Sequence, residues 1–204
     1  MRCYFTLIPT LFALAMLTAC GGHDHDHNSD QGGTPSSFDA VSKAVCVLSP
    51  TEGSELPDVA GTITFTQTKS GLLVEADLTG LKPNSKHGLH IHQWGDVSAA
   101  DGSATGGHFD PQGVGKHALP DIHSHGDLVH ALVLGHAGGL GNIETDDQGN
   151  ATYTMSYENL SLTKANAVLG RGVILHRDED TGEPPSSDAG AFVAQGVIGV
   201  ADPG

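Results

Sequence analysis

The segment TITFTQTKSGLLVEADL occupies residues 62–78 and alternates apolar with polar residues in two stretches. The apolar members of this alternation are Ile63, Phe65, Leu72, Val74, Ala76 and Leu78. The same alternation returns in ATYTM at residues 151–155. A period of two residues is typical of half-buried β-strands, and no long segment has the 3.6-residue period of an amphipathic helix. The pattern therefore predicts an all-β sandwich or barrel.

Two stretches of low hydrophobicity, residues 93–120 and 177–191, interrupt the strand pattern. Both are too long to be hairpin turns, so we expect two long loops on a rigid β scaffold. Such loops commonly carry binding and catalytic residues.

Charge and composition exclude several functional classes. The 204 residues include 24 acidic and 9 basic side chains, for a formal net charge of −15. Nucleic-acid binding depends on Lys and Arg that neutralise phosphates, so we expect no nucleic-acid partner. A basic membrane-surface helix is excluded for the same reason. The hydrophobic content of 38% suffices for one core, and one domain is expected.

The first residues have the character of an export signal. Arg2 is the only charge within residues 1–19, and an apolar run leads to LTAC at residues 17–20. This ending resembles the lipobox of bacterial lipoproteins, which implies that Cys20 is acylated and anchors the chain. Gly21 resembles the residue that directs lipoproteins to the outer membrane, so we expect the periplasmic side of that membrane. The alternative is cleavage near Ala19 without a lipid, which would leave a soluble periplasmic protein.

Residues 20–37 are predicted to form a flexible, His-rich tether ahead of the domain at residues 38–204. The tether contains HDHDH at residues 23–27, which could capture divalent metal loosely or serve only as a solvated linker. After processing, Cys46 is the only remaining internal thiol, so no intrachain disulfide is available. We expect Cys46 to be a small buried residue on a first strand.

Histidines are the unusual feature of the composition, because 9 of the 13 lie between residues 87 and 136. HGLHIH at residues 87–92 places His90 and His92 two apart in a strand context, on one face. Two imidazoles on one face are suited to copper or zinc. Other histidines stand in short glycine-rich or apolar motifs, at His108, His117, His136 and His176.

With these motifs the chain resembles the copper/zinc superoxide dismutase family, from residue 42 to residue 201. The most specific matches are HGLHIH at 87–92 with WGD at 94–96, and GGHFDP at 106–111. The resemblance implies a Greek-key β-sandwich or barrel with two long functional loops. It also implies copper and zinc as cofactors and superoxide as substrate.

The resemblance implies a site residue by residue. Its copper ligands are His90, His92, His108 and His176. Its zinc ligands include His108, which bridges the two metals, His117 and His136. Its catalytic residues are His108 and His176, and Asp180 would accept hydrogen bonds from one copper and one zinc histidine. His87 would support the loop and strand without binding metal.

The implied activity suits these residue types. Copper with imidazole ligands can oxidise one superoxide to oxygen and reduce the next to peroxide, while His108 takes and returns a proton. Zinc would organise the loop. The alternatives are a non-catalytic copper- and zinc-binding protein of the same fold, and a structural or adhesion module.

The zinc loop departs from the family pattern. The family's zinc aspartate falls at Gly139, and the chain before His136 carries an insertion of about ten residues, which surface loops tolerate. Candidate ligands in the insertion are Asp121, His123, His125, Asp127 and His130. Asp127 could fold back to complete the zinc site, an inserted histidine could do so, or the site could be incomplete. We favour Asp127; a solvated polar loop is the remaining alternative.

Two further departures concern the copper loop and its access channel. The family's cysteine pair falls at about Asp101 and at Gln195, so loop order must come from zinc and hydrogen bonds. The Arg that the family keeps over copper falls at Phe192, which removes positive potential from a strongly acidic protein. Lys116 and Arg177 could compensate, although strand alternation points Arg177 away from the His176 side. Members of this family pair through different faces, and a homodimer is one expected assembly.

Overall fold

The computed structural model describes residues 41–115, 121–125, 128–132, 136–182 and 189–202, which all lie in the unit Pro35–Gly204. For residues 121–132 only the backbone of the two strands is described. The predicted leader, the lipid-bearing Cys20 and the tether lie outside the described residues. Within the described residues, no helix is both long and apolar enough to cross a membrane.

The described residues form eleven strands and one short 3₁₀ helix. The strands are β1 (Lys43–Pro50), β2 (Ala60–Gln67), β3 (Leu72–Thr79), β4 (Lys86–Ile91), β5 (Asp121–His125), β6 (Leu128–Leu132), β7 (Gly139–Glu144), β8 (Ala151–Tyr157), β9 (Gly172–His176), β10 (Phe192–Val197) and β11 (Gly199–Val200). The 3₁₀ helix η1 (Ser103–Thr105) lies in the first long loop. The prediction of an all-β fold is confirmed.

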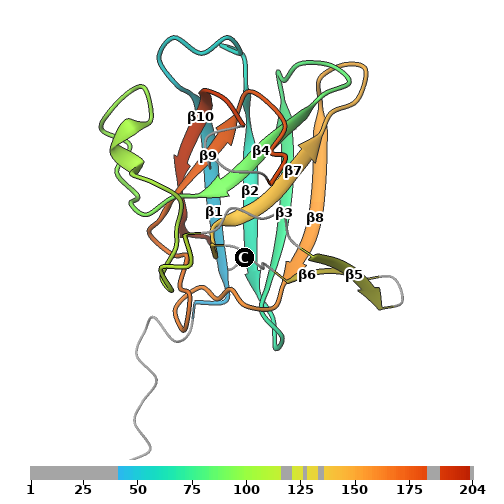
Figure 1. Ribbon diagram of the computed structural model, residues 1–204, viewed down its shortest axis with the longest axis vertical. Coiled ribbons are helices and arrows are strands. Elements are labelled where there is room, and N and C mark those ends of the chain that lie inside the picture. Colours follow the sequence, from blue (N-terminus) through green and yellow to red (C-terminus); the bar gives the residue numbers. More distant parts are fainter. Residues whose placement is uncertain (1–40, 116–120, 126–127, 133–135, 183–188, 203–204) are drawn as a thin grey trace, which may run out of the picture. The chain divides into compact units, whose positions relative to one another are not determined.

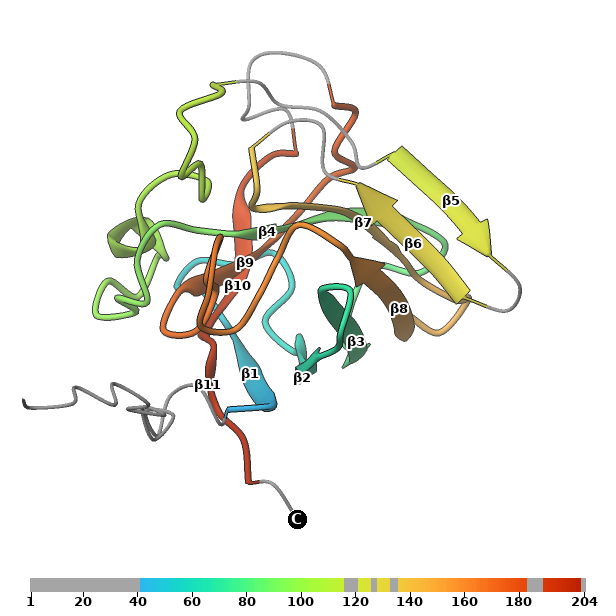
Figure 2. The ribbon, with the colours of Figure 1, turned by 90° about the horizontal axis from the view of Figure 1, so that it is seen from below.

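Eight of the described strands form a nearly closed antiparallel barrel in the order β8-β3-β2-β1-β10-β9-β4-β7. β4 pairs with β7 and β9 rather than with β3, so the chain crosses the end of the barrel after β3 and again after β8. These crossings make the Greek-key topology. Figure 1 shows β4 and β7 running in front of β1, β2 and β3, and Figure 2 views the same strands from below.

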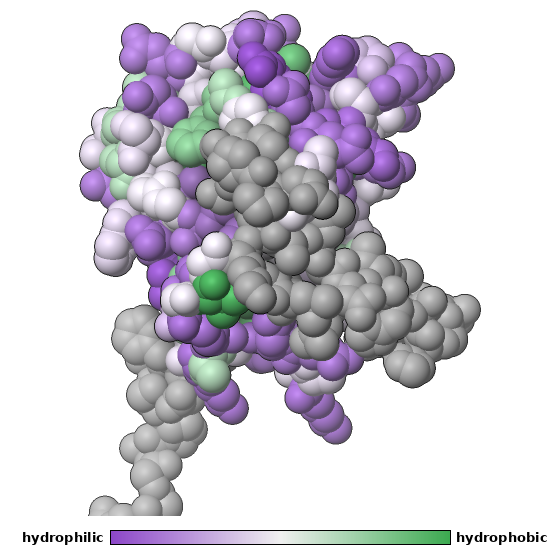
Figure 3. Space-filling view, in the orientation of Figure 1, coloured by the Kyte–Doolittle hydropathy of each residue, from purple (hydrophilic) through white to green (hydrophobic). Residues whose placement is uncertain are grey.

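The core lies between the two sides of the barrel. The predicted apolar positions of β2 and β3 are buried, whereas the polar residues between them point outward. Cys46 is also buried, on β1, and it carries a free thiol as expected. The face in Figure 3 is mostly hydrophilic over the described residues, in keeping with an apolar interior and a polar surface.

The insertion forms strands rather than the polar loop that was the alternative expectation. β5 and β6 make an antiparallel hairpin in which His123 is opposite His130, and β6 pairs in parallel with β8 at two positions. Figures 1 and 2 both show this hairpin beside β8. The edge of β8 supplies backbone hydrogen-bonding groups, which is why an inserted segment can be ordered there as a strand.

Candidate metal centre

His90 and His92 come from the end of β4. The β4 backbone is fixed on both sides, because it pairs with β7 and β9. His92 lies just beyond the last strand residue, and its N–H donates to the Gly172 carbonyl at 2.8 Å. Both imidazoles are buried and belong to one cluster, which agrees with the predicted two-residue period.

His108 is brought to the same place by a backbone junction between the first long loop and two strands. The Phe109 N–H donates to the Ile91 carbonyl at 2.9 Å, and the Gly138 N–H donates to the Phe109 carbonyl at 2.8 Å. A side chain at Gly138 would overlap the Ile91 carbonyl oxygen. Glycine at residue 138 is therefore required for the approach that places His108 beside β4.

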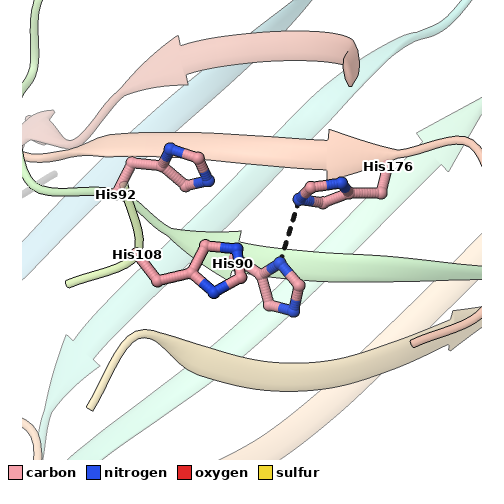
Figure 4. Close-up of side chains that lie close together, drawn as sticks. All are labelled: His90, His92, His108 and His176. Carbon is pink, nitrogen blue, oxygen red and sulfur yellow. Dashed lines mark hydrogen bonds between the residues drawn. The ribbon is translucent and has the colours of Figure 1, made fainter. Parts of the chain in front are cut away.

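His176 ends β9 and completes a group of four imidazoles. His90, His92, His108 and His176 each offer a ligand atom, and these atoms all lie within 4.8 Å of one another. Figure 4 shows the four rings facing a common centre, with the dashed line joining His90 and His176. Nitrogen ligands bound to a metal ion at about 2 Å lie at comparable separations.

Partners on the outside of the cluster set the tautomers of three of these rings. His92 Nδ1 donates to the Gly106 carbonyl at 2.8 Å. His176 Nδ1 donates to the Gly190 carbonyl at 3.1 Å. His90 Nε2 lies 2.7 Å from Asp180 Oδ2 and donates to this carboxylate. Because a neutral imidazole carries one proton, the other nitrogen of each ring presents a lone pair to the centre.

These lone pairs favour a cation at the centre. His90 Nδ1 and His176 Nε2 are 2.9 Å apart. Two acceptor nitrogens at that distance repel each other unless a proton or a metal ion lies between them. Among the described residues, His92 Nε2 is buried without a hydrogen-bond partner. A buried unpaired nitrogen costs about 1–3 kcal/mol, which a metal bond would offset. Four imidazoles suit copper, so the residues present fit that metal.

The protonation of the cluster is also suited to metal binding. Burial lowers the pKa of His92 to about 4, and burial together with the neighbouring imidazoles lowers the pKa of His108 far below its ordinary value. Both rings are therefore neutral near pH 7 with lone pairs available. Metal ligands must be in this deprotonated form.

Asp180 lies behind His90, on the side away from the centre of the copper-side cluster, which is the group of His90, His92, His108 and His176. Its carboxylate is buried, and besides His90 it accepts the Gly182 N–H through Oδ1 at 2.8 Å. Asn142 fixes its backbone twice, because Nδ2 donates to the Asp180 carbonyl and Oδ1 accepts the Asp180 N–H, both at 2.8 Å. Carboxylates in this position orient metal-binding histidines. The role of Asn142 was missed from the sequence, where it is one residue of an ordinary glycine-rich strand.

His87 has no place in the cluster. Its Nδ1 lies 3.0 Å from the His176 carbonyl oxygen and its Nε2 lies 2.9 Å from Ser85 Oγ. Both ring nitrogens are therefore hydrogen-bonded to groups outside the metal centre. This geometry agrees with the expected supporting role between β4 and β9.

The structure describes only some of the expected zinc ligands. His108 Nδ1 lies 2.9 Å from His136 Nε2, so two of the expected ligands are adjacent. Gly139, at the position of the family's aspartate, has no side chain to offer. His117 and Asp127 lie outside the described residues, as do the side chains of the inserted histidines. The choice among the alternatives for the fourth ligand therefore stays a prediction.

Phe192 lies against the copper-side cluster, where the resemblance implied an Arg. Its ring centroid is 5.3 Å from that of His92 and 5.2 Å from that of His176. Arg177 does not replace the missing charge, because it is exposed and bonded to Asp178 and Glu55. Lys116 lies outside the described residues.

Comparisons with known proteins agree with this geometry. The sequence profile described as copper/zinc superoxide dismutase (SODC) matches residues 59–198. A superoxide dismutase [Cu-Zn] from Schizosaccharomyces pombe is 41% identical over 152 residues, covering 70% of this chain and 91% of the relative. A solved structure described as the clock protein EA4 superposes with a TM-score of 0.61 at 34% identity, covering 78% of this chain and 95% of that one.

Proposed function

Because this chain belongs to the copper/zinc superoxide dismutase family, we propose that it is a superoxide dismutase with copper and zinc cofactors that works outside the cytoplasm. The observation that carries the proposal is the convergence of lone pairs from His90, His92 and His176 on one point. Such a centre is arranged for a metal ion.

The proposed ligands of each metal are mainly histidines. His90, His92, His108 and His176 would hold copper, and His108, His117 and His136 would hold zinc. Asp127 is the proposed fourth zinc ligand, with an inserted histidine or an incomplete site as the alternatives. Asp180 would orient His90 from behind.

Copper, when bound, supplies the one-electron couple by which two superoxide anions and two protons become dioxygen and hydrogen peroxide. The protein contributes a proton carrier and a fixed geometry. His108 faces His136 through Nδ1, so its Nε2 is the atom that would hold a proton and return it to the reduced product. His176 is oriented by the Gly190 carbonyl, which keeps its Nε2 toward the centre.

A non-catalytic metal-binding protein is the second candidate, and a specific contact favours it. Phe192 packs against His92 and His176 in place of a cationic side chain, on a chain of net charge −15. A negative substrate is attracted poorly to such a site. This arrangement suits metal capture better than fast turnover.

One experiment separates the two candidates. The purified protein is loaded with copper and zinc, the metals are counted per chain, and superoxide turnover is compared with that of free copper. Turnover well above free copper, lost in His92→Ala, supports the enzyme. Full metal content with no turnover above free copper would sink the dismutase and favour the metal-binding protein.

We further propose that the mature chain is a lipoprotein, anchored through Cys20 on the periplasmic side of the outer membrane. The support is the LTAC motif after the apolar run of residues 1–19. Expression with a labelled fatty acid, followed by membrane fractionation, should label the wild type and not Cys20→Ala. If the wild-type protein carries no labelled fatty acid and is found in the soluble fraction, a soluble periplasmic protein is favoured.

A homodimer is the last part of the proposal. Val47, Trp94 and Val200 are 62%, 61% and 58% exposed, and exposed apolar side chains that lie together can mark a protein–protein interface. The segments that carry them are close. A Cβ on Gly95 would lie 3.0 Å from the Val197 side chain, and a Cβ on Gly196 would overlap the Val47 carbonyl oxygen. Sedimentation of the wild type and of Trp94→Asp should show a dimer and a monomer respectively; a monomeric wild type would refute the dimer.

A further inference from the structure

The inserted hairpin of β5 and β6 brings several metal-binding residue types to one of its faces. His123 lies directly opposite His130 in the antiparallel register. Residues directly opposite in such a pair share a face of the sheet, and so do residues two apart along one strand. Asp121 and His125 are two residues from His123 in either direction along β5. These four residues therefore occupy one face of the hairpin, which we call the histidine face.

The other face of the hairpin has a different composition. By the same register it holds Ile122, Ser124, Val129 and Ala131, none of which is a common zinc ligand. The strand period thus separates the metal-binding residue types from the others. The histidine face is consequently a local concentration of imidazoles, and more than a chance abundance of histidine in the insertion.

Pairing with β8 assigns the histidine face to the outer side of the sheet. In the parallel ladder between β6 and β8, His130 is opposite Ser156, and Ala131 is opposite Tyr157 (Figure 2). Ser156 shares its face of β8 with Thr154, which is exposed, whereas Tyr157 is fully buried. The face that holds His130 therefore continues the solvent side of β8, and the face that holds Ala131 continues the apolar interior.

The spacing of the three histidine positions suits a metal ion. Directly opposite residues have Cβ atoms about 4.5–5.5 Å apart, and diagonal pairs about 7–8 Å apart remain within reach of long side chains. His123 and His130 are an opposite pair, and His125 is diagonal to His130. Imidazole is a common ligand of zinc, and zinc sites in proteins are built from three or four such donors. A position on the solvent side also leaves a path by which an ion can enter.

We propose that the histidine face of the hairpin is a separate zinc-binding site, outside the copper–zinc centre. The site comprises the positions of His123, His125 and His130, with Asp121 at its edge. It uses the inserted histidines for this ion rather than for the fourth zinc position of the copper–zinc centre. Because zinc capture needs no turnover, the inference does not depend on dismutase activity.

The test counts zinc on the full protein. The three histidines of residues 23–27 are replaced by Asn, so that the tether adds no site of its own. This background protein is loaded with copper and zinc and then dialysed against buffered Zn²⁺, and the bound zinc is measured per chain. We expect about two zinc ions per chain, one in the copper–zinc centre and one on the hairpin.

Substitutions on the two faces of β5 give the matched comparison. His123→Asn and His130→Asn should each bind about one zinc ion fewer than the background protein. Ser124→Asn introduces the same residue on the other face of β5 and should keep the full zinc content. His130→Cys replaces one type of zinc ligand by another and should also keep the ion, which separates the loss of a ligand from unfolding of the hairpin.

The possible failures are distinguishable. Equal zinc content in His123→Asn, His130→Asn and Ser124→Asn would refute the hairpin site, and so would loss of the ion from His130→Cys. If the background protein holds about one zinc ion, and its loss in His130→Asn alters the copper(II) resonance spectrum, an inserted histidine completes the copper–zinc centre and the separate site is overturned. If the background protein shows no nitrogen-ligated copper, the proposed copper site fails, while zinc lost from His123→Asn but kept in Ser124→Asn still supports the hairpin site.

Discussion

The Gln195 side-chain amide donates from Nε2 to the carbonyl oxygen of Ala99 at 3.0 Å. This bond ties β10 to the first long loop, at the place where the family resemblance implied a disulfide. Nε2 also lies 3.4 Å from the Ala100 carbonyl oxygen. The expectation that hydrogen bonds order this loop is supported for the described residues, and the tie does not depend on redox conditions.

Replacing Gln195 with Leu should loosen the first long loop. Leu is of similar size but cannot donate, so the Ala99 carbonyl keeps only the Gly102 N–H as a partner, and the lost hydrogen bond costs about 1 kcal/mol. Amide hydrogen exchange should accelerate at Gly102, whose N–H donates to that same carbonyl oxygen. Gln67→Leu is the matched control, because Gln67 makes comparable bonds to Gly71 and Leu162 elsewhere. Equal exchange at Gly102 in the two variants would count against the tie.

Removing the Asp180 carboxylate should weaken copper binding. Asp180→Ala leaves His90 Nε2 without its 2.7 Å partner, so the ring loses its orientation. Losses of about 10- to 100-fold in metal affinity are usual for such changes. Competition with a coloured chelator measures the affinity. Asp178→Ala removes an exposed carboxylate two residues away and should change little; equal losses in both variants would contradict the assigned role.

A side chain at Gly88 should destabilise the protein. A Cβ at residue 88 would lie 3.0 Å from the Ala189 Cβ and 3.2 Å from the Asp180 Cβ, so in Gly88→Ala these two neighbours must move by a few tenths of an ångström. Overpacking of this kind costs about 1–3 kcal/mol. Denaturant unfolding measures the loss of stability. At Gly107 an added Cβ meets nothing within 4 Å, so Gly107→Ala is the control and should unfold like the wild type.

The Cys46 thiol should resist alkylation in the folded protein. Burial raises its pKa from 9.0 to about 12, so hardly any thiolate forms at mildly alkaline pH. The neutral thiol is favoured in the folded state, so its contribution to stability is complete below pH 9 and is lost as pH rises toward 12. Iodoacetamide labelling, followed by mass spectrometry, should modify Cys46 only in denaturant. Rapid labelling of the native protein at pH below 9 would contradict this.

Chelation of zinc should loosen residues 95–136. His108 and His136 lie at the two ends of the chain segment that a zinc ion would close. Next to these ends, the Gly138 N–H donates to the Phe109 carbonyl. Hydrogen exchange at the Phe109 and Gly138 amides should accelerate after zinc is removed with copper retained. Unchanged protection at both amides would mean that hydrogen bonds alone hold this region.

Much of the fold and of the copper-side cluster could be predicted from the sequence because both depend on local periodicity. The alternation in β2 and β3 specified which residues face the core, and the spacing of His90 and His92 placed both rings on one face. The insertion was harder to predict, because its pairing with β8 depends on a strand edge about 25 residues farther along the chain.

The sequence by itself determined the residue types that can bind metal and the strand pattern that carries them, since both follow from side-chain chemistry and short-range spacing. Only the tertiary structure decided which imidazole nitrogens face the metal centre and which apolar side chain packs against it. The tautomers of His90, His92 and His176 depend on Asp180, Gly106 and Gly190. The apolar contact of Phe192 with His176 likewise depends on the β9–β10 register. These contacts join residues distant in the chain, and their geometry exists only once the barrel has formed.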